Sequence, residues 1–481
     1  MVFPILPANT LSTGAYDIEN SCRFDDGSSP YLHRTPSSQG SLRKFTFSAW
    51  IKKTENTGGT TFQWLLHSGE ADGDPAFGIG FRGDAFAMLD MSSSTYHIQL
   101  YSNALFRDPS AWYHMVVAVD TEQGTAANRV KVYMNNEQIT SWATGTLPDE
   151  DHDLDGGLNK TSDATEIGRD NYGGGAAYID GYLSEVYFID GTQYAPSDFG
   201  EADEDSGIWK PKDAKDDLTF GTNGFYLEFK ESGVGTASTS TIGADTSGNT
   251  NHLTSSGIAA TDQCTDTPTN NFCTINPLHF GSAVGTVAMS EGNAIFSSSG
   301  SDTWRSSTMA ISKGKWYAEF KITGTATAGG VGINNGIQTA YIGSNSYDYI
   351  FGFSGVVYNN DADAGGSFAA PATNDINGVA VDLDNNKIYW SENGTFLNSG
   401  DPTSGATGTG AISVSSTNPS GFYHFAVGDA GGGTVTFECN FGNPAFTVSS
   451  GNADANGYGN FEYAVPSGYY ALCSKNLAEY G

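Results

Sequence analysis

Apolar and polar residues alternate with a period of two in many short stretches of the chain, and turn-forming residues separate these stretches. The clearest stretch is Lys44–Ile51, where Phe45, Phe47 and Ala49 fall on one face of an expected strand. Residues 112–120 are apolar enough for a buried strand. Further strands are expected over 129–136, which ends in an Asn-Asn turn, and over 178–188, 224–229, 315–322, 422–427 and 434–442.

The segment 379–390 predicts a β-hairpin. Val379–Leu383 and Ile388–Trp390 are apolar runs, and the residues between them favour a turn. Between about residues 236 and 271 no period is visible, which indicates an ordered or semi-ordered connector.

Composition points to the same class of fold. Gly accounts for 61 of 481 residues, aromatic residues reach 12% and charged residues only 16%, whereas ordinary domains have roughly 25% charged residues. Few charges with many aromatic and turn-forming residues favour strands and long loops. We predict an all-β chain of two antiparallel β-sandwich, jelly-roll-like domains joined by a Ser/Thr/Gly-rich connector. The expected parts are an N-terminal arm (1–20), a first sandwich (21–235), the connector (236–271) and a second sandwich (272–481).

The charge balance excludes one class of partner. The chain has 22 basic and 54 acidic residues, a formal net charge of −32, so it lacks the basic footprint that nucleic acid requires. An anionic membrane surface is disfavoured for the same reason. No apolar stretch approaches ~18 residues, so we expect no membrane insertion. Met1–Pro7 lacks the basic region of a standard secretory signal.

The five cysteines are too few for a disulfide scaffold. Cys264 and Cys273 lie close together in the sequence, and whether they pair under oxidising conditions stays open. Buried thiols are expected for Cys22, Cys439 and Cys473.

Four short motifs occur in order in the first sandwich: Phe45–Trp50, Trp112–Val116, Val132–Asn136, and Tyr178–Gly181 followed by Glu185. Together they resemble the laminin-G/pentraxin-like group of concanavalin A-like sandwiches. In the second sandwich, Gly314–Glu319, Gly378–Gly394 and Asn440–Gly442 resemble the opening strand, central hairpin and closing strand of the SPRY sandwich.

The whole chain resembles virion-associated proteins of marine tailed bacteriophages that join these two modules. The recurrent phrases are Asp17–Ser21, Gly224–Phe229 and Thr267–Phe272. The resemblance implies a virion-surface adhesin, in a tail fibre, tail tip or head decoration, that touches the host surface. Its implied partners are a host-surface glycan or receptor and other virion proteins, the latter through the arm Val2–Pro7. A homo-oligomer is expected, with a trimer as the commonest fibre state, although no heptad or shaft repeat supports one.

Asp151, Asp153 and Asp155 precede a glycine at alternate positions, a spacing that lets one turn wrap Ca²⁺ with carboxylate oxygens. The twelfth position of such a loop is Ser162, so Asp163 or Glu166 would have to replace the usual bidentate Glu. The alternative is a solvated acidic loop. Ca²⁺ bound by Asp151, Asp153, Asp155 and Asp163 is the cofactor prediction.

Enzymatic motifs are missing from the sequence. The Glu-x-Asp-x-x-Glu pattern of concanavalin A-like glucanases is absent, since Pro75 and Ser206 stand where the last Glu would follow Glu70 and Glu201. Nucleophile-elbow, phosphate-loop and His-Glu-x-x-His motifs are absent too. We therefore expect a non-enzymatic protein.

Sugar binding needs aromatic faces beside amide and hydroxyl groups. Candidate ligand-binding residues are Tyr96, Asn171, Tyr172, Tyr341, Tyr347, Tyr349 and Tyr358. Packing within the sheets is an equally good explanation for half or more of these tyrosines.

Two other functions compete with the adhesin. One is a structural decoration or cementing protein that binds neighbouring virion proteins, and the other is a polysaccharide depolymerase that would depend on Glu70 or Asp72.

Overall fold

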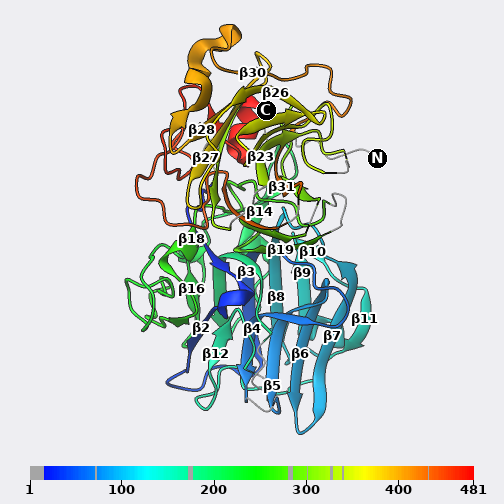
Figure 1. The fold of residues 1–481 in the computed structure, drawn as a ribbon. Helices are drawn as coiled ribbons and strands as arrows, with labels where there is room; N and C mark the ends of the chain where they lie inside the picture. Colours follow the sequence, from blue (N-terminus) through cyan, green and yellow to red (C-terminus); the bar gives the residue numbers. More distant parts are fainter. Residues whose placement is uncertain are drawn as a thin grey trace. The chain divides into compact units, whose positions relative to one another are not determined.

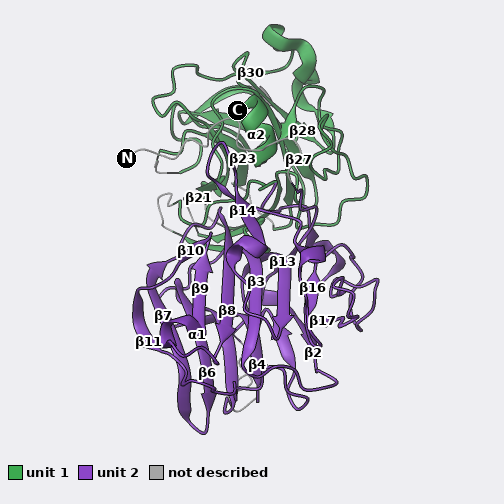
Figure 2. Cartoon of the chain, turned by 180° about the vertical axis from the view of Figure 1, so that it is seen from behind, with its two compact units in different colours: residues 1–11, 270–481 green, residues 12–269 purple. Residues whose placement is uncertain are grey.

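The computed structural model describes residues 16–70, 73–171, 177–279, 285–300, 302–324, 329–337, 341–431 and 433–481. The chain divides into two compact units, shown in purple and green in Figure 2. In the described part, the boundary lies between Thr269 and Asn270. We call residues 12–269 the N-terminal unit and residues 270–481 the C-terminal unit.

The N-terminal unit contains two antiparallel eight-stranded sheets and a small hairpin (Figure 1). The first sheet has the order β10-β9-β8-β3-β13-β1-β18, and β16 also pairs with β13. Its strands are β1 (Ser21–Phe24), β3 (Lys44–Lys53), β8 (Trp112–Asp120), β9 (Val130–Met134), β10 (Glu137–Gln138), β13 (Gly181–Asp190), β16 (Phe225–Leu227) and β18 (Gln263–Cys264).

The second sheet of this unit has the order β11-β7-β6-β5-β4-β12-β2-β17. Its strands are β2 (Tyr31–Arg34), β4 (Phe62–Gly69), β5 (Ala76–Arg82), β6 (Ala85–Ser92), β7 (Thr95–Leu105), β11 (Trp142–Thr146), β12 (Thr165–Ile167) and β17 (Thr254–Ser256). The hairpin consists of β14 (Gly200–Ala202) and β15 (Trp209–Pro211).

The core of the N-terminal unit contains side chains from both large sheets. As the alternation predicts, Phe45, Phe47 and Ala49 of β3 all belong to it. The opposite face of the first sheet is also buried, because Phe199 and Phe220 pack on it. Trp209 of β15 donates its indole N–H to His114 Nδ1 at 2.9 Å, which places His114 in a structural role.

The C-terminal unit has a nine-stranded and a six-stranded sheet, in which the pairings are antiparallel except that of β33 with β22. The larger sheet contains β19 (Thr286–Ser290), β20 (Ile295–Ser299), β22 (Lys315–Ile322), β27 (Ile376–Asp382), β28 (Lys387–Glu392), β29 (Thr395–Phe396), β30 (Ile412–Ser413), β32 (Thr434–Asn440) and β33 (Tyr470–Ala471). The smaller contains β21 (Thr303–Ser306), β23 (Gly329–Asn334), β24 (Tyr349–Gly352), β25 (Val356–Asn359), β26 (Ala362–Ser367) and β31 (His424–Asp429). The predicted hairpin at 379–390 is formed by β27 and β28.

Helical elements are short throughout the described residues. They are α1 (Ala126–Arg129), α2 (Ser474–Tyr480) and the 3₁₀ turns η1 (Asp26–Ser28), η2 (Pro196–Asp198), η3 (Lys215–Asp217), η4 (Ala260–Asp262), η5 (Leu397–Ser399) and η6 (Pro402–Thr407). Within these described ranges, no helix has the length and apolar character needed to cross a bilayer. The predicted fold class, all-β with antiparallel sandwiches, is confirmed.

The connector expected over 236–271 is different in the structure. Residues up to Thr269 belong to the N-terminal unit, where β17 pairs with β2 and β18 pairs with β1. Two buried ion pairs hold the segment, Arg23–Asp262 at 2.9 Å and Lys52–Asp266 at 2.7 Å. These strands have only two or three residues, too few to produce a visible period. The sandwich therefore extends beyond the expected end at residue 235.

The five cysteines are buried thiols. Of the expected N-terminal arm, residues 1–15, including the docking segment Val2–Pro7, lie outside the described residues. The described end of the arm packs on the N-terminal unit, because Tyr16 donates its hydroxyl to Glu185 Oε2 and the Ile18 N–H donates to Thr269 Oγ1.

Candidate functional site

Three polar side chains form a row on the outer face of the second sheet of the N-terminal unit. Glu166 of β12 lies directly opposite His33 of β2 on one side and His67 of β4 on the other. Their strand neighbours Leu32, Leu66 and Ile167 belong to the core. Because side chains alternate along a strand, His33, His67 and Glu166 project from the face turned away from the core.

An arginine and two aromatic rings surround this row. Arg169 contacts Glu166 Oε1 at 2.7 Å, and its guanidinium lies 3.4 Å from the centre of the Tyr31 ring. The Trp64 ring lies 6.1 Å from that of His67. We call Tyr31, His33, Trp64, His67, Glu166 and Arg169 the outer-face cluster.

Among the residues that the structure describes, three buried atoms of the outer-face cluster have no hydrogen-bond partner: His67 Nδ1, Glu166 Oε2 and Arg169 Nε. His67 and Glu166 are each only 3% exposed. Burial, with a smaller contribution from the charge of Arg169, lowers the pKa of His67 to about 3, so the imidazole is neutral. Buried polar atoms are normally paired. The cluster therefore has one free acceptor, one free donor and one nitrogen that can do either, depending on its tautomer.

Sequence reasoning missed most of this cluster. The sequence predicts Glu166 only as an alternative calcium ligand, and no motif singles out His67. The cluster depends on the register of three strands that are far apart in the chain, so no local spacing reveals it. The available signal is weak: His33, His67 and Glu166 each stand next to an apolar residue, namely Leu32, Leu66 and Ile167.

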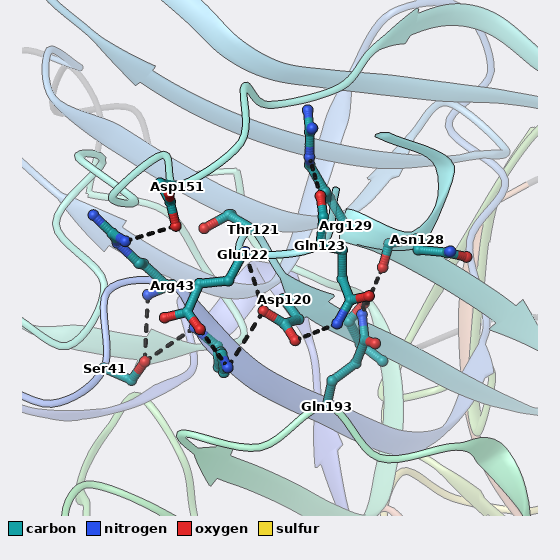
Figure 3. Close-up of polar contacts among 12 residues, drawn as sticks. Ser41, Arg43, Asp120, Thr121, Glu122, Gln123, Asn128, Arg129, Asp151 and Gln193 are labelled. Atoms are coloured by element: carbon teal, nitrogen blue, oxygen red, sulfur yellow. Dashed lines mark hydrogen bonds and ion pairs between the residues drawn. The ribbon is translucent and has the colours of Figure 1, made fainter. Parts of the chain in front are cut away.

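The four predicted calcium ligands are not brought together. Asp151 and Asp153 both contact Arg43, at 2.9 and 2.6 Å, and Figure 3 shows Arg43 directed at Asp151. Asp155 lies 3.5 Å from Lys160, whereas Asp163 is buried and accepts the Ser162 hydroxyl. These contacts explain the acidic loop as part of a network of ion pairs. Calcium at these residues stays a prediction.

A tighter carboxylate group lies elsewhere in the N-terminal unit. Among the described residues, Asp25, Asp26 and Asp180 each offer an oxygen within 4.8 Å of the other two. Burial raises the pKa of Asp180 well above its ordinary value, and the nearby charge of Asp25 raises it further. Such carboxylates are stabilised by a proton or by a cation, so these three residues could hold a divalent metal.

The residues predicted to bind ligand have separate environments. Tyr96 is 44% exposed, Asn171 is exposed, and Tyr172 lies outside the described residues. In the C-terminal unit, Tyr341 donates to Asp361 and Tyr358 shares a hydrogen bond with Ser354. Tyr347 packs against the core, and Tyr349 is buried within it. Tyr349 also lines a cavity of the C-terminal unit.

Comparison with solved structures finds similar folds for parts of the chain. The SPRY domain of human HERC1 is 13% identical, with 32% of this chain and 91% of that one covered and a TM-score of 0.26. A heptameric SAP-like pentraxin from Limulus polyphemus is 17% identical, with 37% and 80% covered and a TM-score of 0.26. A protein described as a putative carbohydrate binding protein from Bacteroides ovatus is 17% identical, with 50% and 58% covered and a TM-score of 0.30.

No curated protein matches the chain. A family match does exist, and it covers the segment that contains the whole outer-face cluster. Residues 26–193 match the concanavalin A-like lectin/glucanases superfamily, in its laminin-G-type branch.

Proposed function

We propose that the N-terminal unit binds a carbohydrate at the outer-face cluster without cleaving it. The observation that carries this proposal is the set of three unpartnered atoms on His67, Glu166 and Arg169. Sugar hydroxyls both donate and accept hydrogen bonds, so they complement a free acceptor beside a free donor. The match of residues 26–193 to a superfamily of lectins and glucanases supports this ligand class.

The geometry favours binding over hydrolysis. Glycosidases place two carboxyl groups roughly 5–9.5 Å apart across the scissile bond. Here the positions opposite Glu166 on both neighbouring strands are histidines, and Glu166 itself is engaged by Arg169. The cluster therefore lacks the paired acid groups of that mechanism, which supports a non-enzymatic role.

The finer part of the proposal concerns the biological setting. The phage-like phrases at 17–21, 224–229 and 267–272 support a virion-surface adhesin of a tailed bacteriophage that contacts a host glycan or receptor. Many weak contacts would combine into firm attachment if the protein is present in several copies. Antibody labelling of intact particles tests this location, and the absence of label from the particle surface would contradict it.

The binding proposal is tested with a glycan array probed by the full chain and by three variants. Glu166→Gln replaces the carboxylate with an amide, and the array signal should fall about tenfold or more, as for a lost hydrogen bond to a carboxylate. Glu201→Gln is the matched control, because Glu201 is an exposed acid paired with Lys210 on the β14–β15 hairpin. Arg169→Lys serves as a second test if the melting temperature of Glu166→Gln lies below that of the wild type. Array binding that is equal for all four proteins would contradict the proposal.

A further inference from the structure

The C-terminal unit contains a cavity of about 520 Å³. Its wall includes Tyr349 of β24, Asn359 of β25, Trp390 of β28 and Ser413 of β30. Strands from both sheets of the unit therefore form it. The volume lies within the roughly 300–1,000 Å³ that is usual for small-molecule sites.

The polar atoms of the aromatic wall residues already form hydrogen bonds, so these residues offer mainly their rings to a ligand. The Trp390 indole N–H donates to the Val331 carbonyl at 3.1 Å, and the Tyr349 hydroxyl accepts the Ser415 N–H at 2.9 Å. Phe368 adds a third ring to the wall. Burial raises the pKa of Tyr349, so its hydroxyl is neutral.

The polar wall residues retain unused hydrogen-bonding capacity. Asn359 donates from Nδ2 to the carbonyls of Ser346 and Asp348, which leaves its Oδ1 as an acceptor. Asn398 makes only a 3.4 Å contact from Nδ2 to the Gly410 carbonyl. Ser413 Oγ accepts from Lys387 Nζ at 3.0 Å, so its own proton can be donated. The cavity thus has donors and acceptors beside three aromatic rings.

No described wall residue carries an ionised side chain. A charged ligand would lose its hydration in this cavity without gaining a counter-charge from the wall, which is costly. An anionic ligand would depend on a cation beside the wall, such as Lys387, which contacts Ser413. A ligand with apolar ring faces and several hydroxyls fits the wall without that penalty.

We propose that this cavity is a second, independent binding site and that it takes a neutral sugar of one or two residues. The site lies wholly in the C-terminal unit, so it does not depend on the outer-face cluster. With a site in each unit, one chain binds two saccharides. The two interactions strengthen attachment when a single surface carries both saccharides.

The test measures binding of neutral methyl glycosides, the matching uronic acids and an uncharged tripeptide to the full chain by calorimetry. At least one neutral glycoside should bind, with the matching acid weaker by about tenfold or more. Ala364→Trp places an indole in the cavity from an exposed wall position and should abolish the binding that remains in Glu166→Gln. Ala370→Trp, at an exposed position outside the wall, should leave it unchanged.

The outcomes separate this site from the first. Glu166→Gln should not affect cavity binding, and Ala364→Trp should not affect binding at the outer-face cluster. Preference for the uronic acid that disappears in Lys387→Met would overturn the proposal, as would preference for the tripeptide. Failure of every neutral glycoside to bind at millimolar concentration, or binding unchanged in Ala364→Trp, would also overturn it.

Discussion

At the scale of single residues, the buried pair Lys52–Asp266 connects the end of the N-terminal unit to its first sheet. Both side chains are fully buried, their contact is 2.7 Å, and the Trp112 indole N–H also donates to Asp266. Asp266→Leu should destabilise the unit by about 3–5 kcal/mol, because it removes the carboxylate that faces a buried ammonium. Urea unfolding measures this change.

The double variant Lys52→Met/Asp266→Leu is the control for that prediction. It removes both charges, so most of the lost stability should return. If the double variant is as unstable as the single one, the packing of Asp266 rather than its charge holds the segment.

A second residue-scale prediction concerns pH. His152 Nε2 lies 2.8 Å from Asp90 Oδ2, and this hydrogen bond raises the pKa of His152. Asp153 and Asp155 raise it further, while the ring of His97 stacks on it at 4.5 Å. Since the folded state holds the proton more tightly, the pair contributes its full stability below the unfolded pKa of about 6.5. That contribution is lost as pH rises through the raised folded pKa.

The measurement compares melting temperatures of the wild type and His152→Gln across pH. The wild type should be the more stable at about pH 5.5, and the gap should shrink as the histidine deprotonates. A gap that is constant from pH 5.5 to about 9 would show that the charge of His152 has no role.

At the scale of elements, the sequence predicted regular strands well. The alternating runs correspond closely to β3 and β22, and the turn-rich segment near 384–387 joins β27 to β28. The sequence did not predict β17 and β18, which have only two or three residues and show no local period. The ion pairs Arg23–Asp262 and Lys52–Asp266 hold the residues on either side of β18. The outer-face cluster was beyond sequence reasoning because it requires β2, β4 and β12 to pair in one register.

The β9–β10 turn gives a testable element-scale prediction. Asn135 and Asn136 have φ values of 50° and 68°, and Asn135 Oδ1 accepts the His114 N–H at 2.7 Å. Asn136→Ala should cost about 1 kcal/mol, because a Cβ without a local polar partner disfavours this conformation. Asn136→Gly should be neutral or stabilising. Denaturant unfolding measures the stability of both variants. Equal stabilities of Asn136→Ala and Asn136→Gly would contradict the turn geometry.

At the scale of the whole molecule, calcium binding is tested through its effect on the stability of the folded chain. If Ca²⁺ binds the folded chain, chelation should lower a melting transition, by about 2.7 kcal/mol of stability if calcium had been at 100 times its Kd. Asp180→Asn should abolish the calcium effect if Asp25, Asp26 and Asp180 hold the ion. Asp155→Asn should abolish it if the predicted loop does. Identical melting with calcium and with chelator would exclude both sites.

We propose that each of the two β-sandwich units has its own saccharide site and that neither unit cleaves its ligand. The most direct test incubates the full chain with the polysaccharide it binds best on the array and follows both retention and chain length. We predict retention that falls in Glu166→Gln, with the polysaccharide length unchanged. Shortening of the polysaccharide by wild type but not by Glu166→Gln would contradict the account.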